Sequence, residues 1–417
     1  MIFPITCNAS VRGNHVKSTA LWGNLLKRES ALQIRIETFQ PFLYRSQSIP
    51  KTIVLTLTSS SRNMIFFFTI HLILFGLGEA ITESQPGNVT SCDLTSWALT
   101  NTHIHAIPPT YAAAIAAAGG DPSGFPTPDW SLNGTLASLD QVGSARGVLS
   151  ISTPGVPIAG TGKVARKLCR ELNIYMEGLV RQIPSRLDFF AALPDWRDVN
   201  GTLAEIEWIF CVQKTAVGVG FYTGYGDKLP GDPMFKPIWD RLEQLKALTF
   251  MHPGVMEVKP LYIGGFLPQP IVDFPQQTTR AAVDLVFSGT RSRTPNVDMI
   301  LSHAGGTLPF ISERVVGSLI VPQIANSTTV NITQVASEFA RYYYDIALGG
   351  TTTQLNGLLD ISSPSHVLMG SDYPYTPQIG VQENQALYLA WAATHPQMGP
   401  EVLTANAKRE ILAHRIT

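Results

Sequence analysis

Strand-like and helix-like segments alternate along the chain from Trp97 onward, which is the pattern of βα units and a parallel sheet. Eight short apolar stretches have the composition of buried parallel strands. They cover residues 97–102, 147–152, 187–193, 216–222, 248–251, 297–302, 343–348 and 366–370. Eight strands with helices between them predict an α/β fold, a (β/α)8 TIM-like barrel with loop insertions and an N-terminal extension.

Between these strands, apolar residues recur at helical spacing. Helices are predicted at 110–118, 163–181, 234–245, 278–287 and 334–341, with closing helices at 383–395 and 400–412. Stretches rich in Pro and Gly at 119–130, 224–233 and 260–275 predict long loops. On a barrel such loops build the substrate pocket, although each could equally be a plain surface insertion.

Ionisable residues stand at the ends of four predicted strands. His103 and His105 follow the first strand, and His252, His303 and Asp372 each follow an apolar run and come before Gly or Pro. In a (β/α)8 barrel the carboxyl ends of the strands meet on one face, where active sites lie. We therefore expect these side chains to lie close together.

The pair His103 and His105 is the strongest metal-binding signal in the chain. Residues two apart in an extended segment point to the same side, so both imidazoles can bind one ion. A lone pair of this kind is more often an ordinary surface or core feature, and only the whole set makes a site. With His252 and Asp372 the set holds three imidazoles and one carboxylate, which suits one divalent ion, Zn²⁺ first and Mn²⁺ as the alternative.

Charge and cysteine content exclude several classes of protein. The formal net charge is −1, so no basic face is expected, nucleic acid is not an expected partner and a small molecule is the expected substrate. The four cysteines, Cys7, Cys92, Cys169 and Cys211, form no Cys-x-x-Cys pair. We predict neither a disulfide framework nor a zinc finger.

The N-terminal part differs from the rest. Residues 1–63 are basic and serine-rich, and their acidic residues are Glu29 and Glu37. We interpret them as a non-catalytic extension, which is either a transit-like segment or an upstream stretch wrongly included in the gene model. Residues 64–80 form an apolar, signal-like or anchor segment that could contact a membrane, or alternatively a buried segment. The catalytic domain is expected at 92–417.

A signal at 64–80 would send the chain along the secretory or endomembrane route. Asn-x-Ser/Thr sequons would then be candidates for glycosylation. They lie at Asn88, Asn133, Asn200, Asn326 and Asn331. The alternative is that these sequons occur by chance.

Four ordered motifs carry a family resemblance that runs from Trp97 to Leu412. They are NTHIHAIPP, FMHPG, LSHAGGTLPFISER and MGSDYPYTP. Together they resemble the amidohydrolase superfamily, and within it the decarboxylases related to aminocarboxymuconate-semialdehyde decarboxylase. The chain is most similar to the fungal 6-methylsalicylate decarboxylases, which form m-cresol in polyketide secondary metabolism. Family members are mostly treated as cytosolic, which opposes the secretory interpretation.

The resemblance implies a role for each motif residue. His103, His105, His252 and Asp372 fall on the metal ligands, and His303 falls on the catalytic histidine. Arg314 falls on an arginine that reaches the substrate carboxylate of a neighbouring subunit, which implies a homodimer. The superfamily's bridging lysine is missing from the end of 216–222, so a single metal is expected.

The expected reaction is non-oxidative decarboxylation of an o-hydroxybenzoate, in which a proton must reach the ring carbon that bears the carboxylate. Asp372 is the hypothesised proton donor and His303 its partner. Each of these residues also has a non-catalytic alternative. His303 could be a supporting polar residue, Asp372 a turn residue and Arg314 a surface ion-pair partner. The alternative functions are a metal-dependent lactone or amide hydrolase and a non-catalytic secreted binding protein.

Overall fold

The computed structural model describes residues 32–38, 52–59, 68–73 and 99–414, and the chain divides into two compact units, 1–89 and 90–417. In the first unit, β1 (Leu32–Thr38), β2 (Thr52–Ser59) and β3 (Phe68–Ile73) form an antiparallel sheet in that order. Strand β3 takes up the middle of the apolar segment 64–80, and the rest of that segment lies outside the described residues. Within the described residues no helix combines the length and the apolar character needed to cross a membrane.

The second unit is built around eight parallel strands, each beside its neighbour in the sequence. They are β4 (Leu99–His105), β5 (Ser144–Ser150), β6 (Leu187–Ala191), β7 (Gly218–Tyr222), β8 (Leu248–His252), β9 (Asp298–Leu301), β10 (Tyr343–Asp345) and β11 (Val367–Leu368). The barrel closes between the first and last strands, where the amide of Thr102 donates to Met369 O at 2.8 Å and that of His105 to Tyr373 O at 2.8 Å. The predicted (β/α)8 barrel is confirmed.

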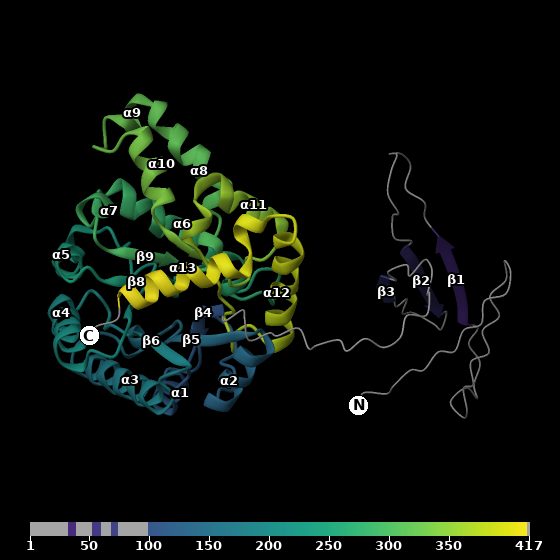
Figure 1. Ribbon diagram of the computed structural model, residues 1–417, viewed down its shortest axis with the longest axis horizontal. Helices are drawn as coiled ribbons and strands as arrows, with labels where there is room; N and C mark the ends of the chain where they lie inside the picture. Colours follow the sequence, from purple (N-terminus) through teal and green to yellow (C-terminus); the bar gives the residue numbers. More distant parts are fainter. Residues whose placement is uncertain (1–31, 39–51, 60–67, 74–98, 415–417) are drawn as a thin grey trace, which may run out of the picture. The chain divides into compact units, whose positions relative to one another are not determined.

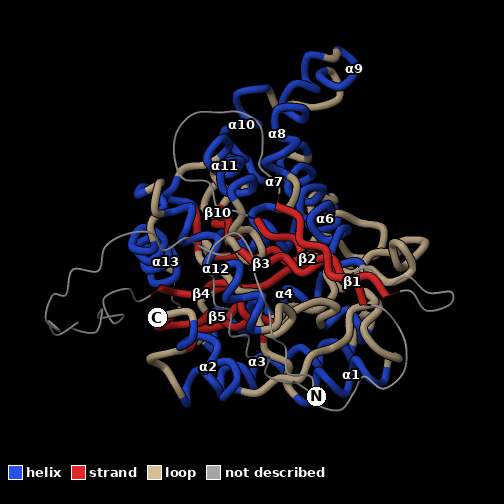
Figure 2. The backbone as a smooth tube through the Cα atoms, turned by 90° about the vertical axis from the view of Figure 1, so that its right-hand side faces the viewer, coloured by secondary structure: helices blue, strands red, loops and turns tan. Residues whose placement is uncertain are grey.

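Helices surround this barrel in both views (Figures 1 and 2). They are α1 (Pro109–Ala117), α2 (Leu132–Gln141), α3 (Lys163–Gln182), α4 (Val199–Glu207), α5 (Lys236–Gln244), α6 (Gln269–Phe287), α7 (Thr290–Arg293), α8 (Leu308–Gly317), α9 (Pro322–Ala325), α10 (Ile332–Ala340), α11 (Thr352–Ile361), α12 (Gln378–Ala392) and α13 (Pro400–Ala413). The apolar stripe of α3 faces the strands, with Leu168, Leu172, Met176 and Leu179 buried. This is how an amphipathic helix stabilises a sheet.

One predicted loop is partly wrong. Residues 260–275 were expected to be irregular because of their prolines, yet α6 begins at Gln269 and includes Pro275. Pro270 stands in the first turn, where a helix needs no backbone N–H donor. The carbonyl of Pro275 still accepts hydrogen bonds, from Thr279 Oγ1 at 3.0 Å and from the amide of Thr307 at 3.3 Å.

The barrel interior is filled by apolar side chains at the amino ends of the strands and lined by polar side chains at their carboxyl ends. Val148, Phe190, Leu248 and Ile300 pack together with residues of α13, whose Ala407 and Ile411 join the same buried cluster. Further along β8, Phe250 and then His252 point the same way, since side chains two apart in a strand share a face. The apolar layer thus supports the residues at the carboxyl ends of the strands.

Candidate metal centre

His103 and His105 lie at the carboxyl end of β4, both fully buried. Their Nε2 atoms are 3.1 Å apart, so the two imidazoles point to one place, as the spacing of the pair predicts. The ring of Phe250 packs edge-on against His103 with the ring centres 5.0 Å apart. The pair is therefore held on a packed apolar layer.

Asp372 and His252 complete the group. Asp372 Oδ1 lies 3.0 Å from His105 Nε2 and 3.3 Å from His103 Nε2, and one atom from each of the four residues falls within 4.8 Å of the others. Asp372 has a φ of 61°, which is unusual for a residue other than Gly. Such strain is concentrated at functional sites.

The donor set fits a bound divalent cation. Four ligand atoms about 2.0–2.2 Å from one ion lie roughly 3.3–3.5 Å apart in a tetrahedron. The measured separations of 3.0, 3.1 and 3.3 Å are close to that edge length. Lone pairs packed this closely repel one another unless a positive charge lies between them.

Three outer hydrogen bonds fix the imidazole tautomers. His103 Nδ1 donates to both oxygens of Asp345, at 3.0 and 3.1 Å, and His252 Nδ1 donates to the carbonyl of Pro253 at 3.0 Å. The hydroxyl of Ser150 donates to Ile104 O and is left to accept from His105 Nδ1 at 2.8 Å. Each Nε2 lone pair is thereby turned toward the common centre, the arrangement typical of metal-ligating histidines.

Buried charge also favours a cation at this place. Burial lowers the pKa of His103, but the charges of Asp345 and Asp372 outweigh it and raise that pKa to about 10. Burial and the neighbouring imidazoles hold the pKa of His252 well below its ordinary value. Burial would raise the pKa of Asp372, but hydrogen bonds from three histidines hold it well below its usual range. The buried carboxylates of Asp345 and Asp372 therefore need a nearby positive charge to offset the free-energy cost of burying them.

His303 follows β9 and faces Asp372. Its Nε2 lies 3.6 Å from Asp372 Oδ2, and its backbone amide donates to Asp345 Oδ1 at 3.3 Å. His303 and Ala304 both have a φ of 55°, so the turn after β9 is strained and aims the imidazole into the site. His303 is beside the four candidate ligands, as expected, and is not one of them.

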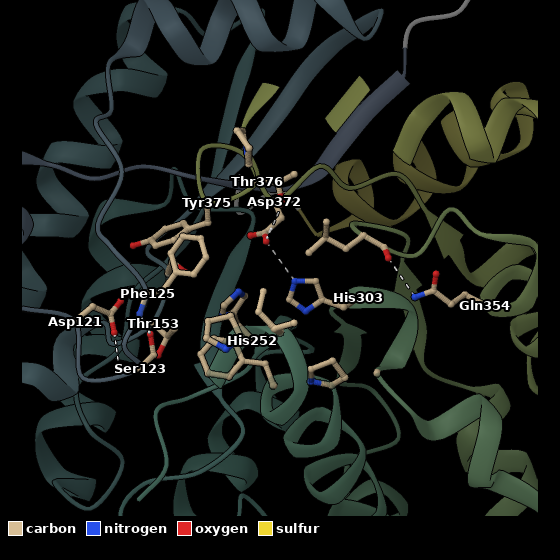
Figure 3. Close-up of a pocket in the computed structure, with 18 residues that line it drawn as sticks. Asp121, Ser123, Phe125, Thr153, His252, His303, Gln354, Asp372, Tyr375 and Thr376 are labelled. Atoms are coloured by element: carbon tan, nitrogen blue, oxygen red, sulfur yellow. Dashed lines mark hydrogen bonds and ion pairs between the residues drawn. The ribbon is translucent and has the colours of Figure 1, made fainter. Parts of the chain in front are cut away.

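A cavity of about 450 Å³ opens above the metal ligands (Figure 3). His252, His303 and Asp372 lie at its base, and most of its wall is apolar. The remaining lining residues are Asp121, Ser123, Phe125, Ser152, Thr153, Pro270, Ile271, Phe274, Pro275, Gly306, Leu348, Gln354, Tyr375, Thr376 and Pro377. A cavity of this size admits a small aromatic molecule. The long loop 119–130 does contribute to the wall, through Asp121, Ser123 and Phe125.

Arg314 is the one predicted site residue that lies away from this cavity. It is exposed on α8, and among the described residues its side chain has no hydrogen-bond or ion-pair partner. It does not line the cavity of its own chain. Its contact with a neighbouring subunit stays a prediction.

The site contains one candidate metal position. Strand β7 ends at Tyr222, whose hydroxyl donates to Ile151 O at 3.1 Å, so no lysine bridges a second ion there. The described part of the chain has a second group of His and acidic residues, formed by Asp298, Glu410 and His414. Asp298 is the first residue of β9, so this group lies at the opposite end of that strand from the candidate metal centre. Cys169 is buried and Cys211 exposed, both as free thiols.

Sequence reasoning missed Asp345 and Ser150. Asp345 ends β10 inside the stretch 343–348, which was read only as an apolar strand. A fully buried acidic residue in such a run is itself a signal of a paired charge, since lone charges are rarely buried. Ser150 ends β5 and carries no comparable signal.

Comparison with known proteins matches the chain to the Amidohydrolase family and finds decarboxylases among its relatives. The sequence profile of the Amidohydrolase family matches residues 101–414. The chain is 36% identical over 285 residues to decarboxylase yanB of Aspergillus niger, covering 66% of this chain and 77% of that protein. It is 36% identical over 278 residues to the 6-methylsalicylic acid decarboxylase of Penicillium expansum, covering 66% and 84%.

A solved structure shares the fold. It is a dihydroxybenzoic acid decarboxylase from Polaromonas with bound manganese and the inhibitor 2-nitroresorcinol. The TM-score is 0.62 and the identity 18%, over 76% of this chain and 97% of that one.

Proposed function

The chain belongs to the amidohydrolase family, and from that premise we propose that it is a metal-dependent decarboxylase of an o-hydroxybenzoate. The first candidate reaction is 6-methylsalicylate to m-cresol and CO2, the substrate named for the relative from Penicillium expansum. The observation that carries the proposal is the set of three Nε2 lone pairs and one carboxylate at the base of a cavity of aromatic size.

His103, His105, His252 and Asp372 would hold the ion. When bound, a divalent cation supplies Lewis acidity and orients oxygen ligands of a substrate. We propose Zn²⁺ because three imidazoles are borderline ligands that suit it. The manganese of the Polaromonas enzyme makes Mn²⁺ the competing candidate, and metal analysis of the purified protein distinguishes them.

His303 and Asp372 are proposed to deliver the proton. Decarboxylation requires a proton at the ring carbon, since the electrons of the breaking bond must not remain as an aryl anion. Asp372 is the proposed donor of that proton to the carbon, and His303, whose Nε2 lies 3.6 Å from Asp372 Oδ2, is its proposed partner in the transfer. Asp372→Asn should therefore abolish turnover, while near-normal activity would remove Asp372 from the reaction.

Arg314 is proposed to bind the substrate carboxylate of a partner subunit in a homodimer. Its exposure and lack of a partner among the described residues support this role. Mixing the inactive variants Arg314→Ala and His303→Ala tests it. Shared sites would restore part of the activity in mixed dimers, whereas self-contained sites would leave the mixture inactive.

The decisive experiment is incubation of metal-replete protein with a panel of hydroxybenzoates, scored for CO2 and the matching phenol. Chelation should abolish the activity and added Zn²⁺ or Mn²⁺ should restore it. The control is His103→Ala, which should be inactive with either ion. Ring opening of a lactone without CO2 release would instead identify the hydrolase alternative.

A further inference from the structure

Polar groups gather at one side of the cavity, away from His303. Figure 3 shows Asp121, Ser123 and Thr153 together on one side and His303 and Gln354 on the other. Asp121 and Ser123 belong to the loop after α1, and Thr153 to the segment after β5. Two separate loops therefore build this polar side.

Two atoms of this group lack hydrogen-bond partners. Asp121 Oδ1 accepts from the amide of Ser123 at 2.8 Å, but Asp121 Oδ2 is shielded from solvent and has no partner among the described residues. Thr153 Oγ1 is also shielded from solvent and without a partner among the described residues, and Thr153 as a whole is only 3% exposed. Buried polar atoms are nearly always paired, so two in one place call for an explanation.

The loop holds Asp121 in place. The carbonyl of Ser123, which is fully buried, accepts from the amide of Gln269 at the start of α6 at 3.1 Å. The hydroxyl of Tyr262 donates to Gly124 O at 3.4 Å. These contacts fix the backbone of the loop next to Asp121, and the amide of Ser123 holds one oxygen of the Asp121 carboxyl.

Ile271, Phe274 and Leu348 line the same cavity and are apolar, and burial raises the pKa of Asp121 above its ordinary value. Tyr375 also lines the cavity, and its hydroxyl is likewise buried without a hydrogen-bond partner among the described residues. An occupant of the cavity can supply the partner that these polar atoms lack. A hydroxyl group is a suitable partner because it both donates and accepts.

We propose that Asp121 and Thr153 form a hydroxyl-recognition subsite, and that the preferred substrate is an o-hydroxybenzoate with a second hydroxyl remote from the metal ligands. That hydroxyl donates to Asp121 Oδ2 and accepts from Thr153 Oγ1. The inference rests on the proposed decarboxylase function and narrows its substrate class. A methyl group in this position leaves both atoms unpaired, so 6-methylsalicylate should undergo the same reaction with a lower kcat/KM than its hydroxylated analogue.

The experiment compares substrate pairs that differ by one hydroxyl. The probes are salicylate and 6-methylsalicylate, each beside analogues with a ring hydroxyl or a hydroxymethyl group. At least one hydroxylated analogue should exceed its parent in kcat/KM by 10-fold or more. Equal or lower values for every hydroxylated analogue would overturn the subsite.

Two variants assign the preference to these residues. Asp121→Asn keeps the acceptor for the Ser123 amide but replaces the unpaired oxygen by a donor, and Thr153→Val removes the hydroxyl at nearly constant shape. Each should reduce the hydroxylated-to-parent ratio at least 10-fold, and an unchanged ratio in both contradicts the proposal. The matched control is Asp129→Asn, on the same loop but exposed, which should keep the wild-type ratio.

A binding measurement tests the hydroxyl subsite even if the protein is not a decarboxylase. If no hydroxybenzoate loses CO2, calorimetry compares binding of m-cresol with binding of 3-hydroxybenzyl alcohol, which differs by one hydroxyl. Tighter binding of the alcohol, lost in Asp121→Asn, supports the subsite without any catalysis. No difference between the two phenols counts against it.

Discussion

Asp345 is the residue on which the histidine geometry depends most. It accepts from His103 Nδ1 and from the backbone amides of His303 and Ala347, so one carboxylate orients a candidate ligand and the candidate catalytic turn. It is fully buried. Its charge also offsets that of the ion the site would hold.

Asp345→Asn should lower metal affinity about 10–100-fold, because an amide can still accept from His103 but carries no charge. Titration with Zn²⁺ in the presence of a competing chelator measures this. Asp360→Asn, an exposed aspartate on α11, is the control and should titrate like the wild type. Unchanged affinity in Asp345→Asn would show that the contact is only structural.

Among single residues, the candidate metal ligands could be predicted from the sequence, but the residues that orient them could not. His103, His105, His252 and Asp372 are polar residues at the ends of apolar runs, so pattern alone reveals them. Asp345 and Ser150 act through hydrogen bonds to partners 242 and 45 residues away in the sequence. Only the closed barrel brings those pairs together.

The turn after β9 packs closely against α6. Gly306 has a φ of 67°, and a Cβ there would overlap the carbonyl oxygen of Pro275. Gly306 also lines the cavity three residues after His303. The position therefore requires glycine for both conformation and space.

Gly306→Ala should destabilise the barrel by at least about 2 kcal/mol, since the left-handed conformation alone costs about 1–2 kcal/mol for a residue with a Cβ. Urea denaturation measures the change. Gly317→Ala at the end of α8, where a Cβ meets nothing within 4 Å, is the matched control and should be neutral or stabilising. Equal stability of the two variants would disprove the predicted steric conflict.

Helix α4 is joined to α3 by an ion pair at its N-terminus. Asp198 accepts from the amide of Gly201 at 3.1 Å and pairs with Arg166. The hydrogen bond from Arg166 holds the pKa of Asp198 below its ordinary value. The unfolded chain therefore binds this proton more tightly than the folded one, so the contribution is present above about pH 4 and is lost as the pH falls below it.

Asp198→Asn should lower stability at pH 7, and its deficit should shrink as the pH falls below about 4. Asn still caps the helix, so Asp198→Ala should be less stable than Asp198→Asn at every pH, by about 1 kcal/mol. Chemical denaturation of the three proteins from pH 7 to pH 3 checks both. A deficit that grows toward low pH would contradict the sign of the shift.

The order of elements could be predicted because each strand and helix carries its own local pattern. All eight strands were found, although β11 covers only Val367–Leu368 of the predicted 366–370. The start of α6 was missed because Pro270 and Pro275 read locally as loop residues. Packing of Phe274, Ala281 and Leu285 in the core outweighs that local preference.

At the scale of the whole molecule, every element of the site lies in the second unit. The barrel strands, their closure and the cavity all fall between Leu99 and Ala413. A chain that starts at Thr90 should keep the melting temperature and kcat/KM of the full chain. Loss of folding or activity in this truncated chain would assign the N-terminal extension a role in the barrel.

Two expectations, a homodimer contact and N-linked glycans, concern the same projection of the second unit, which is formed by α8, α9 and α10. Figures 1 and 2 both show α9, which lies between α8 and α10 in the chain, standing away from the barrel beyond those two helices. Phe310, on α8 with Arg314, is 90% exposed and Ile320 is 76% exposed, which suits contact with another subunit. The sequon residues Asn326 and Asn331 are exposed on the same projection.

A glycan at Asn326 should therefore exclude a dimer that forms through this face. Protein secreted from a eukaryotic host and protein from a bacterial host should differ in size by light scattering, with the glycosylated form monomeric. The double variant Asn326→Gln and Asn331→Gln, which removes both sequons from this surface, should restore the dimer in the secreted form. A glycosylated dimer would place the subunit contact elsewhere.

Helix α13 inserts Ala407 and Ile411 into the barrel and blocks the end opposite the metal ligands. Substrate and products are therefore expected to pass through the open side of the cavity, where the side chains of Ile271 and Leu348 are half-exposed. An aromatic acid that enters there shares its route with the CO2 and the phenol that leave. A bulky molecule bound over Ile271 and Leu348 should then block entry and release together.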